Sequence, residues 1–189
     1  MRIIAGNWRG KKLLSPNGKN IRPTGDRAKS ALFNILENSA EYSSWPIERS
    51  TVLDAFCGTG SLGLECLSRG AKEAYFLENN HRSINLLRRN IVLLGAENNT
   101  RILEKDATSP GRAIVRASVI FMDPPYRTNL GEKALEAFVS NGWVSAGTLL
   151  VIETHATKQL IIPQKLRQLD VRGSGSTRFW FLTRKTRDL

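Results

Sequence analysis

The residues best placed to do chemistry are Asp123-Pro124-Pro125-Tyr126, which directly follow the apolar run 118–122. Such a run predicts a buried strand, so Asp123 emerges at its carboxyl end. Two successive prolines fix their φ angles and remove two N–H donors, which leaves backbone carbonyls without ladder partners. The ring of Tyr126 offers a surface on which a flat base can stack. The turn therefore presents hydrogen-bond acceptors and an aromatic face to a ligand.

These groups suit the chemistry of an exocyclic amine on a nucleobase, whose nitrogen is a poor nucleophile because its lone pair is delocalised into the ring. Asp123 and a prolyl carbonyl can each accept one N–H group, which lets the nitrogen pyramidalise as positive charge grows on it. Asp123 can also take the released proton, directly or through water. We expect a catalytic site at Asp123, Pro124, Pro125 and Tyr126 that needs no metal. The alternative is a rigid structural turn.

A glycine loop lies earlier in the chain, between the apolar run 51–55 and a helical pattern. Gly58 and Gly60 allow a tight turn and a close approach of the backbone to a ligand, and the helix beyond them offers free N–H groups. Glu78 ends the next predicted strand, where a carboxylate can accept both hydroxyls of a ribose. With Asp54 just ahead of the glycines, this pattern predicts a nucleoside-cofactor site. The alternative is a structural turn with Glu78 merely exposed.

The charge of Asp54 distinguishes between two cofactors. The spacing Gly58-x-Gly60-x-x-Gly63 also occurs in nicotinamide-dependent enzymes, but a carboxylate beside the loop would repel their pyrophosphate. It would attract the ammonium group of a methionine moiety. We therefore expect S-adenosylmethionine as cofactor and S-adenosylhomocysteine as product. Asp106 follows a third predicted strand and would reach the adenine edge, the alternative being an ordinary helix cap.

The elements that must position these residues alternate between short apolar runs and helical periodicity. Strands are predicted at 51–55, 73–77, 100–104, 118–122 and 147–153, and helices up to Arg69, over 84–94 and over 132–139. Two further strands, 166–171 and 177–183, are expected at an antiparallel edge. This alternation predicts an α/β fold, a doubly wound and mostly parallel sheet with right-handed crossovers.

The first 50 residues have a different pattern. Residues 1–15 alternate loosely and break at glycines, which predicts a β-hairpin arm. Apolar residues at helical spacing from Ala28 predict a helix with Thr24 or Asp26 as its N-cap, and residues 39–50 are expected to form a polar linker. We expect two units, residues 1–45 as a basic arm and helix and residues 46–189 as the cofactor-binding domain.

The net charge of the 189 residues, +11, is confined to the ends of the chain. Residues 1–50 hold nine Lys and Arg against four Asp and Glu, residues 51–157 hold eleven against eleven, and residues 158–189 hold eight against two. Basic ends around a neutral body are typical of proteins that bind nucleic-acid phosphates. The alternative is two solvated faces.

Composition and termini exclude several classes of protein. An apolar content of 41% and a charged content of 24% argue against collagen, coiled coil and wholesale disorder. We expect a cytoplasmic protein that does not contact membranes, because no apolar run approaches the roughly 20 residues of a bilayer span and no signal-peptide core is present. We expect a monomer because no leftover apolar stripe is obvious. Two cysteines do not make a disulfide framework.

Over almost its whole length the chain resembles the RsmD-type bacterial 16S rRNA (guanine-N2)-methyltransferases. The resemblance rests on the arm at 2–13, Arg22-Pro23-Thr24 with Asp26-Arg27, the segment 32–34, the stretch 54–69 and the turn 123–126. It implies a class I S-adenosylmethionine-dependent methyltransferase fold with an N-terminal β-hairpin arm and helix. It also implies methylation of N2 of one guanine, of the guanine-966 type, during maturation of the small ribosomal subunit. The expected partner is 16S rRNA in an assembling subunit.

The resemblance also assigns residues to the cofactor and the RNA. The cofactor would be held by Asp54, Phe56, Gly58, Gly60, Glu78, Asn79, Asp106 and Ala107. RNA would be contacted by Arg2, Trp8, Arg9, Lys11, Lys12, Arg22, Thr24 and Arg27. The chain departs from the family pattern at Lys29-Ser30, where an Arg-Glu pair is common, and at Asn79, where an acid often follows Glu78.

Other functions remain open at this level. The same amine chemistry could act on adenine N6 or on a protein glutamine, although the basic ends argue against a protein substrate. A DNA enzyme would need a larger recognition segment than the first 50 residues provide. An NAD-dependent oxidoreductase and a non-catalytic RNA-binding protein are further alternatives.

Overall fold

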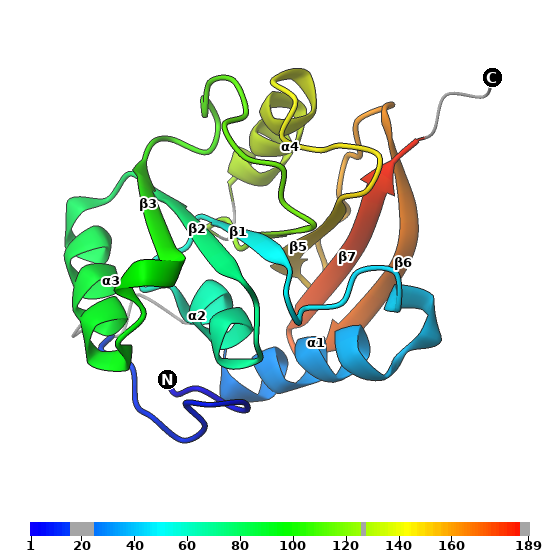
Figure 1. Cartoon of the computed structure of the whole chain (residues 1–189). Coiled ribbons are helices and arrows are strands. Elements are labelled where there is room, and N and C mark those ends of the chain that lie inside the picture. Colours follow the sequence, from blue (N-terminus) through cyan, green and yellow to red (C-terminus); the bar gives the residue numbers. More distant parts are fainter. Residues whose placement is uncertain (16–24, 126–127, 186–189) are drawn as a thin grey trace.

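A computed structural model describes residues 1–15, 25–125 and 128–185 (Figure 1). This part of the chain forms one seven-stranded sheet in the order β3-β2-β1-β4-β5-β7-β6. The strands are β1 (Thr51–Ala55), β2 (Glu73–Glu78), β3 (Thr100–Glu104), β4 (Val119–Met122), β5 (Leu149–His155), β6 (Leu166–Ser174) and β7 (Thr177–Arg184). The helices are α1 (Asp26–Asn38), α2 (Ser61–Ser68), α3 (His81–Leu94) and α4 (Leu130–Ser140), with short 3₁₀ turns η1 (Ala40–Tyr42) and η2 (Glu97–Asn99).

Strands β1 to β5 are parallel, as the alternating pattern predicts. β7 is antiparallel to both β5 and β6, so the antiparallel strand lies one position inside the edge and β6 forms the edge itself. From β1 the strand order runs to β2 and β3 on one side and to β4 and β5 on the other. The carboxyl ends of β2, β1 and β4 therefore flank one crevice. Ligands bind at such a switch point in open α/β sheets.

Helices cover both faces of the sheet (Figure 1). α1, α2 and α3 pack on one face around Leu32, Leu64 and Leu87, and α4 packs on the other around Leu135 and Phe138. The apolar residues of β4 and β5 are buried because both faces are covered, which explains why these strands read as continuous apolar runs. The fold expected from the sequence is confirmed.

The N-terminal arm folds back on itself but does not form a regular hairpin. It has one isolated antiparallel bridge, between Arg2 and Lys12, and its core residues Ile3 and Leu13 are buried against the α1–α3 face. The expected N-cap of α1 is wrong in one respect. Gly25 holds the cap position without a side-chain hydrogen bond, and the side chain of Asp26 pairs with Arg2 instead. Thr24 lies outside the described residues.

Residues 39–50 are not a polar linker. Tyr42 and Ile47 are buried in the core of the α1–α3 face, and the ring of Tyr42 lies 4.8 Å from that of Phe181 in β7. The segment therefore packs α1 onto the sheet. The sequence does not indicate this role, because Tyr42 and Ile47 lie among serines and a proline and their spacing is typical of neither a helix face nor a strand face. The division into residues 1–45 and 46–189 stays a prediction.

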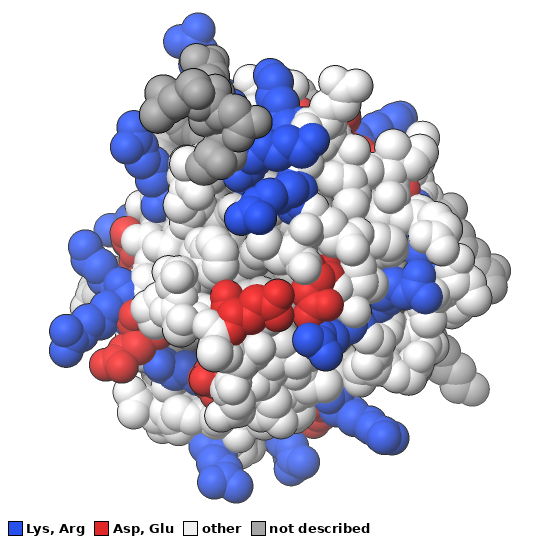
Figure 2. Space-filling view, turned by 90° about the vertical axis from the view of Figure 1, so that its right-hand side faces the viewer, with Lys and Arg blue, Asp and Glu red and all other residues white. Residues whose placement is uncertain are grey.

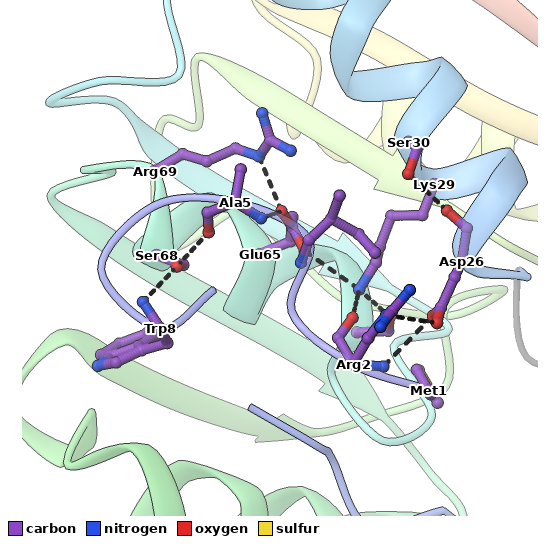
Figure 3. A network of polar contacts seen from close by, with 12 residues as sticks. Met1, Arg2, Ala5, Trp8, Asp26, Lys29, Ser30, Glu65, Ser68 and Arg69 are labelled. Carbon is purple, nitrogen blue, oxygen red and sulfur yellow. Dashed lines mark hydrogen bonds and ion pairs between the residues drawn. The ribbon is translucent and has the colours of Figure 1, made fainter. Parts of the chain in front are cut away.

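A buried ion pair joins the arm, α1 and α2 (Figure 3). The ammonium of Lys29 lies 3.2 Å from the carboxylate of Glu65, and neither side chain is exposed. Lys29 also donates to the Arg2 carbonyl and to the Ser61 hydroxyl. Burial lowers the pKa of Lys29, while the carboxylate of Glu65 opposes that shift. The position where the family commonly has Arg-Glu thus supplies a buried cation here, and Glu65 supplies its counter-charge.

Glu65 is bound on every side. Its two oxygens accept the N–H groups of Ile4 and Ala5 at 2.8 and 3.0 Å, and Arg69 donates to it at 2.9 Å. A buried charge is tolerated only when it is paired and hydrogen-bonded in this way. The carboxylate therefore fixes the arm to α2 through backbone N–H groups, and this attachment does not depend on which side chains most arm residues carry.

The two partners of this ion pair should differ in their effect on stability. Glu65→Gln strands the Lys29 ammonium in the core and leaves one of the two backbone N–H groups without an acceptor, so we expect it to lower the free energy of unfolding by about 3–5 kcal/mol. Lys29→Met leaves Glu65 with Arg69 and two N–H groups, so a loss of about 1–3 kcal/mol is expected. Urea unfolding followed by circular dichroism measures both. The exposed control Glu48→Gln should stay within about 0.5 kcal/mol. A larger loss for Lys29→Met than for Glu65→Gln would contradict this account.

Candidate active site

The glycine loop between β1 and α2 adopts the left-handed backbone that glycine permits. Gly58 has φ +55° and Gly60 φ +83°, and Phe56 reaches φ +59° despite its side chain. The two glycines serve different purposes. A Cβ on Gly58 would meet open space, whereas a Cβ on Gly60 would lie 2.4 Å from Leu87 Cδ1. Gly58 therefore leaves the surface of the loop clear for a ligand, and Gly60 lets the loop pack against α3.

Asp54 lies beneath this loop and is fully buried. Its carboxylate accepts the N–H of Gly63 at 2.9 Å, which fastens the first turn of α2 to β1. Burial raises the pKa of Asp54 to about 7, and the nearby Glu78 charge adds to the rise, although the hydrogen bond from Gly63 opposes it. The structure thus shows Asp54 as the residue that holds the loop in place. Its contact with the methionine moiety stays a prediction.

Glu78 at the end of β2 is held by three backbone N–H groups. One oxygen accepts from Gly58 and the other from Asn79 and Asn80, each at 2.9 Å. The side chain is half-exposed, so the oxygen facing Gly58 keeps a lone pair for a hydroxyl. Asn79 itself is exposed and takes part through its backbone. A carboxylate oriented in advance and lying across a cleared glycine loop is what a ribose diol requires.

Asp106 and Ala107 follow β3 on the same edge of the sheet. Asp106 is exposed, and one of its oxygens accepts the N–H and the hydroxyl of Thr108 at 2.7 and 2.8 Å. Ala107 is buried in the core of the α4 face. The bonds to Thr108 make Asp106 a turn residue in this structure, and its contact with adenine stays a prediction.

The Asp-Pro-Pro turn lies beside the glycine loop. Ala55 pairs with Met122 in the parallel register of β1 and β4, and the N–H of Asp123 donates to the Ala55 carbonyl at 3.4 Å. Asp123 is half-buried, Pro124 is buried and Pro125 is exposed. The glycine motif, which ends at Gly63, and the turn that begins at Asp123 are 60 residues apart in sequence. They nevertheless follow the adjacent ends of two neighbouring strands. Tyr126 lies outside the described residues, and its stacking role stays a prediction.

The turn is supported by residues whose role the sequence did not suggest. The hydroxyl of Thr128 donates to the Pro125 carbonyl at 2.7 Å, and Lys158 Nζ donates to the Thr128 carbonyl at 2.7 Å. Lys158 also pairs with Glu132 in α4. The Pro125 carbonyl therefore already accepts one hydrogen bond, and which prolyl carbonyl accepts from a substrate amine stays a prediction.

Gly131 allows α4 to approach the same turn closely. A Cβ at Gly131 would lie 3.1 Å from Pro124 Cγ and 3.3 Å from Ile152 Cδ1. Such contacts are tighter than ordinary packing, so any larger residue would displace either the helix or the turn. The position of Pro124 thus depends on a glycine in α4.

The arm reaches the site only at its base. At that base, Thr59 in the glycine loop lies 4.0 Å from the Met1 sulfur, and Asn90 in α3 binds both Leu14 and the Thr59 carbonyl. The tip of the arm lies at the far end of α2, where Trp8 donates its backbone N–H to the Ser68 hydroxyl. α2 has eight residues, so base and tip are separated by about 10 Å.

The basic residues expected to contact RNA are distributed along this arm. Arg2, Arg9, Lys11, Lys12 and Arg27 are exposed, and Trp8 is half-buried. Arg2 is paired with Asp26 at 3.3 Å, whereas the other four cations have no ion pair among the described residues. Arg22 and Thr24 lie outside the described residues. RNA contact by these residues stays a prediction.

Two residues that hold the site together were missed by the sequence-based reasoning, although each left a signal. Asn90 stands on the apolar stripe of α3 between Leu87 and Leu94, and a polar residue on such a stripe is unusual. Glu65 is a carboxylate in a helix whose residues are nearly all buried. Buried Asn and Glu require partners, so their positions pointed to polar contacts without naming them.

The described part of the chain comprises residues 1–15, 25–125 and 128–185. That part of the chain contains no group of three or more His, Cys, Asp or Glu side chains able to hold a metal ion. None of its helices combines the length and apolarity required to cross a bilayer.

The parallel sheet, the glycine loop and the Asp-Pro-Pro turn together define a class I methyltransferase. Comparison with known proteins identifies the family. The family model described as Conserved hypothetical protein 95 matches residues 1–183. The chain is 37% identical to Ribosomal RNA small subunit methyltransferase D of Haemophilus influenzae, over 93% of this chain and 89% of that protein. It is 35% identical to the protein of the same name in Escherichia coli K12, over 85% and 77% of the two chains.

A solved structure agrees with these relatives. The yhhF structure from Escherichia coli superposes with a TM-score of 0.80 at 31% identity and covers 98% of both chains. The chain therefore belongs to the RsmD-type methyltransferase family, and the resemblance inferred from its motifs is confirmed.

The raised pKa of Asp54 predicts a specific pH dependence of stability. Between about pH 4 and pH 7 the carboxyl is ionised in the unfolded chain but still protonated in the folded one, so its contribution to stability falls as pH rises. Asp54→Asn lacks this titration. We expect the unfolding free energy of Asp54→Asn, relative to wild type, to rise by on the order of 4 kcal/mol from pH 4 to pH 8. Urea unfolding at several pH values gives this difference. A difference that does not change with pH would contradict a buried, neutral Asp54.

Gly131→Ala tests how closely Pro124 must be positioned. The added methyl group would move the turn by a few tenths of an ångström, so we expect methyl transfer to slow by about three- to tenfold. Cofactor affinity should be unchanged because the nearest atoms to the added methyl group belong to Pro124 and Ile152. Gly147→Ala is the matched control, since a Cβ at Gly147 meets nothing within 4 Å. Steady-state kinetics together with calorimetric cofactor binding separate the two effects. Equal behaviour of both variants would show that the turn tolerates displacement.

Proposed function

We propose that this protein transfers a methyl group from S-adenosylmethionine to the exocyclic N2 amine of one guanine in 16S rRNA, of the guanine-966 type, and releases S-adenosylhomocysteine. The observation that carries the proposal is the hydrogen bond from the Asp123 N–H to the Ala55 carbonyl, which joins the Asp-Pro-Pro turn to the end of β1, where the glycine loop begins. This hydrogen bond supports a site in which acceptors for an amine lie beside a cofactor-binding loop. The relatives named above, whose names specify ribosomal RNA of the small subunit, support the substrate.

The residues of the cofactor site match S-adenosylmethionine. Gly58 leaves open space above the loop, and Glu78 is oriented toward that loop by the Gly58 N–H. When bound, the cofactor supplies a methyl group on a positively charged sulfur, which is already an activated leaving group. Asp54 in β1 accepts the N–H of Gly63 in α2 and so fixes the two ends of the loop relative to each other. No metal is needed for such a transfer.

The role of Asp123 follows from the charge that develops on the amine. As the guanine nitrogen attacks the methyl carbon, the carbon–sulfur bond breaks and positive charge accumulates on nitrogen. The Asp123 carboxylate and a prolyl carbonyl accept its two N–H groups and so stabilise that charge. Asp123 then takes one proton, directly or through water. Thr128 keeps the neighbouring Pro125 carbonyl bonded and the turn rigid.

The arm and α1 provide the RNA side of the proposed enzyme. Arg9, Lys11, Lys12 and Arg27 are exposed cations without ion pairs among the described residues, which suits them to bind phosphates. We propose that the protein acts as a monomer in the cytoplasm, on an assembling small subunit.

The acceptor and product identify the reaction directly. The protein is supplied with methyl-tritiated S-adenosylmethionine and, separately, with bare 16S rRNA, unmodified small subunits, duplex DNA and release factor. Digested products are separated by nucleoside or amino acid. We expect label in N2-methylguanosine from RNA or subunits. Label in N6-methyladenine or methylglutamine would retain the amine chemistry and overturn the substrate, and no label with intact cofactor binding would favour a non-catalytic RNA-binding protein.

Asp123 variants test the mechanism. We expect Asp123→Ala to slow methyl transfer by about 100- to 1000-fold because it removes an acceptor from the developing charge. Asp123→Asn keeps an acceptor oxygen but cannot take a proton, so its loss should be smaller. Cofactor affinity, measured by calorimetry, should match wild type in both. A rate for Asp123→Ala within threefold of wild type would rule out this role.

A further inference from the structure

The C-terminal end of the chain carries a charge excess that the proposed site does not use. Between residues 158 and 185 there are seven Lys and Arg and a single acid, Asp170. Figure 2 faces the side of the molecule that carries β6 and β7. Lys and Arg side chains lie in its upper part and around its margins, and the largest group of Asp and Glu side chains lies near its middle.

Four of these cations lie where β6 begins and β7 ends. Arg184 pairs with Leu166, and Arg167 pairs with Thr183 in the antiparallel register. The N–H of Lys185 donates to the Lys165 carbonyl at 2.9 Å, which extends the register by one step. Because side chains alternate between the two faces of a sheet, Lys165, Arg167 and Lys185 share one face, whereas Arg184 lies on the other face with Leu166. We call Lys165, Arg167 and Lys185 the C-terminal basic cluster.

The cluster has no counter-charge in the described part of the chain. Lys165, Arg167 and Lys185 are exposed, and the guanidinium of half-buried Arg184 donates to the Val144 carbonyl at 2.9 Å. The acid of β6, Asp170, is already paired with Arg172. Like charges at opposite positions of an antiparallel pair destabilise the sheet. A polyanion that binds there would offset this repulsion.

The cluster lies away from the proposed catalytic residues. Lys185 lies two residues beyond the Leu149–Thr183 pair at the start of β5, whereas Asp123 lies one residue beyond the Met122–Ile152 pair. About six residues along the strands and two strand spacings across separate them, which is on the order of 20 Å. The cluster therefore lies too far away to touch the target base and could contact only another part of the RNA.

We infer that the C-terminal basic cluster is a second binding surface for backbone phosphates of the substrate RNA, remote from the nucleotide that is modified. This inference rests on the proposed function. The cluster and the exposed cations of the arm lie on opposite margins of the molecule, so an RNA that contacts both is held at two separated places. Contacts of this kind position the RNA without reading its sequence.

A structural role for the same cations predicts something different. Exposed Lys and Arg on an edge strand such as β6 also prevent edge-to-edge aggregation. That role requires charge on the edge but no contact with RNA. It would appear as a loss of solubility in a neutralised variant, with RNA affinity unchanged.

Matched triple variants separate the two roles. The cluster variant is Lys165→Gln/Arg167→Gln/Lys185→Gln. The control variant is Arg49→Gln/Arg88→Gln/Arg172→Gln, which removes the same number of charges from exposed arginines that already pair with acids. Binding of a 16S rRNA transcript, and of an unrelated RNA of equal length, is measured by fluorescence anisotropy over a range of salt concentrations.

The cluster variant should bind both RNAs more weakly. The slope of log affinity against log salt should fall by about 2 to 3, because each lost phosphate contact reduces it by about 1. Rate at saturating RNA and cofactor affinity should be unchanged, and the control variant should bind like wild type. Equal slopes for the two variants would overturn the inference, as would aggregation of the cluster variant with unchanged affinity of its monomeric fraction. Methyl transfer by the wild-type protein is scored separately, so the proposed function can fail or stand independently.

Discussion

The buried ion pair between Lys29 and Glu65 fixes the N-terminal arm and α1 to the helix that follows the glycine loop. Both charges are removed from water, which is costly unless each is fully bonded. Here the carboxylate binds two arm N–H groups and Arg69, and the ammonium binds an arm carbonyl and Ser61. Three segments distant in sequence are thereby held in one arrangement. Because the bonds from the arm use its backbone, its side chains remain available for other contacts.

Asn90 extends the same arrangement to the other end of the arm. Its side-chain amide binds the backbone of Leu14 and the carbonyl of Thr59 in the glycine loop. The buried Asn90 therefore links the base of the arm to the glycine loop. The Asp-Pro-Pro turn is fixed from the opposite face of the sheet, by Gly131 and Thr128. The proposed cofactor and base sites are thus supported by different helices but meet where β1 and β4 end side by side.

The sheet and the two motifs could be predicted from the sequence because each depends on local patterns. Buried parallel strands appear as apolar runs, and the glycines and prolines mark the turns that follow them. Long-range partners could not be predicted in this way. Nothing local indicates that Lys29 faces Glu65, or that Tyr42 reaches β7 from a serine-rich segment. Gly60 packs closely against Leu87, and its expected approach to a ligand stays a prediction, since a glycine in the sequence does not say which close approach it serves.

We expect the arm and the glycine loop to form one cooperative unit. Hydrogen exchange of individual amides tests it most directly, because it measures the free energy at which each part opens. The N–H groups of Ile4 and Ala5 bind Glu65, and that of Gly63 binds Asp54. We predict that these three amides exchange with the same opening free energy under native conditions, and that Glu65→Gln lowers it for all three. Fast exchange of Ile4 and Ala5 beside a protected Gly63 would show that the arm opens independently and would contradict the account.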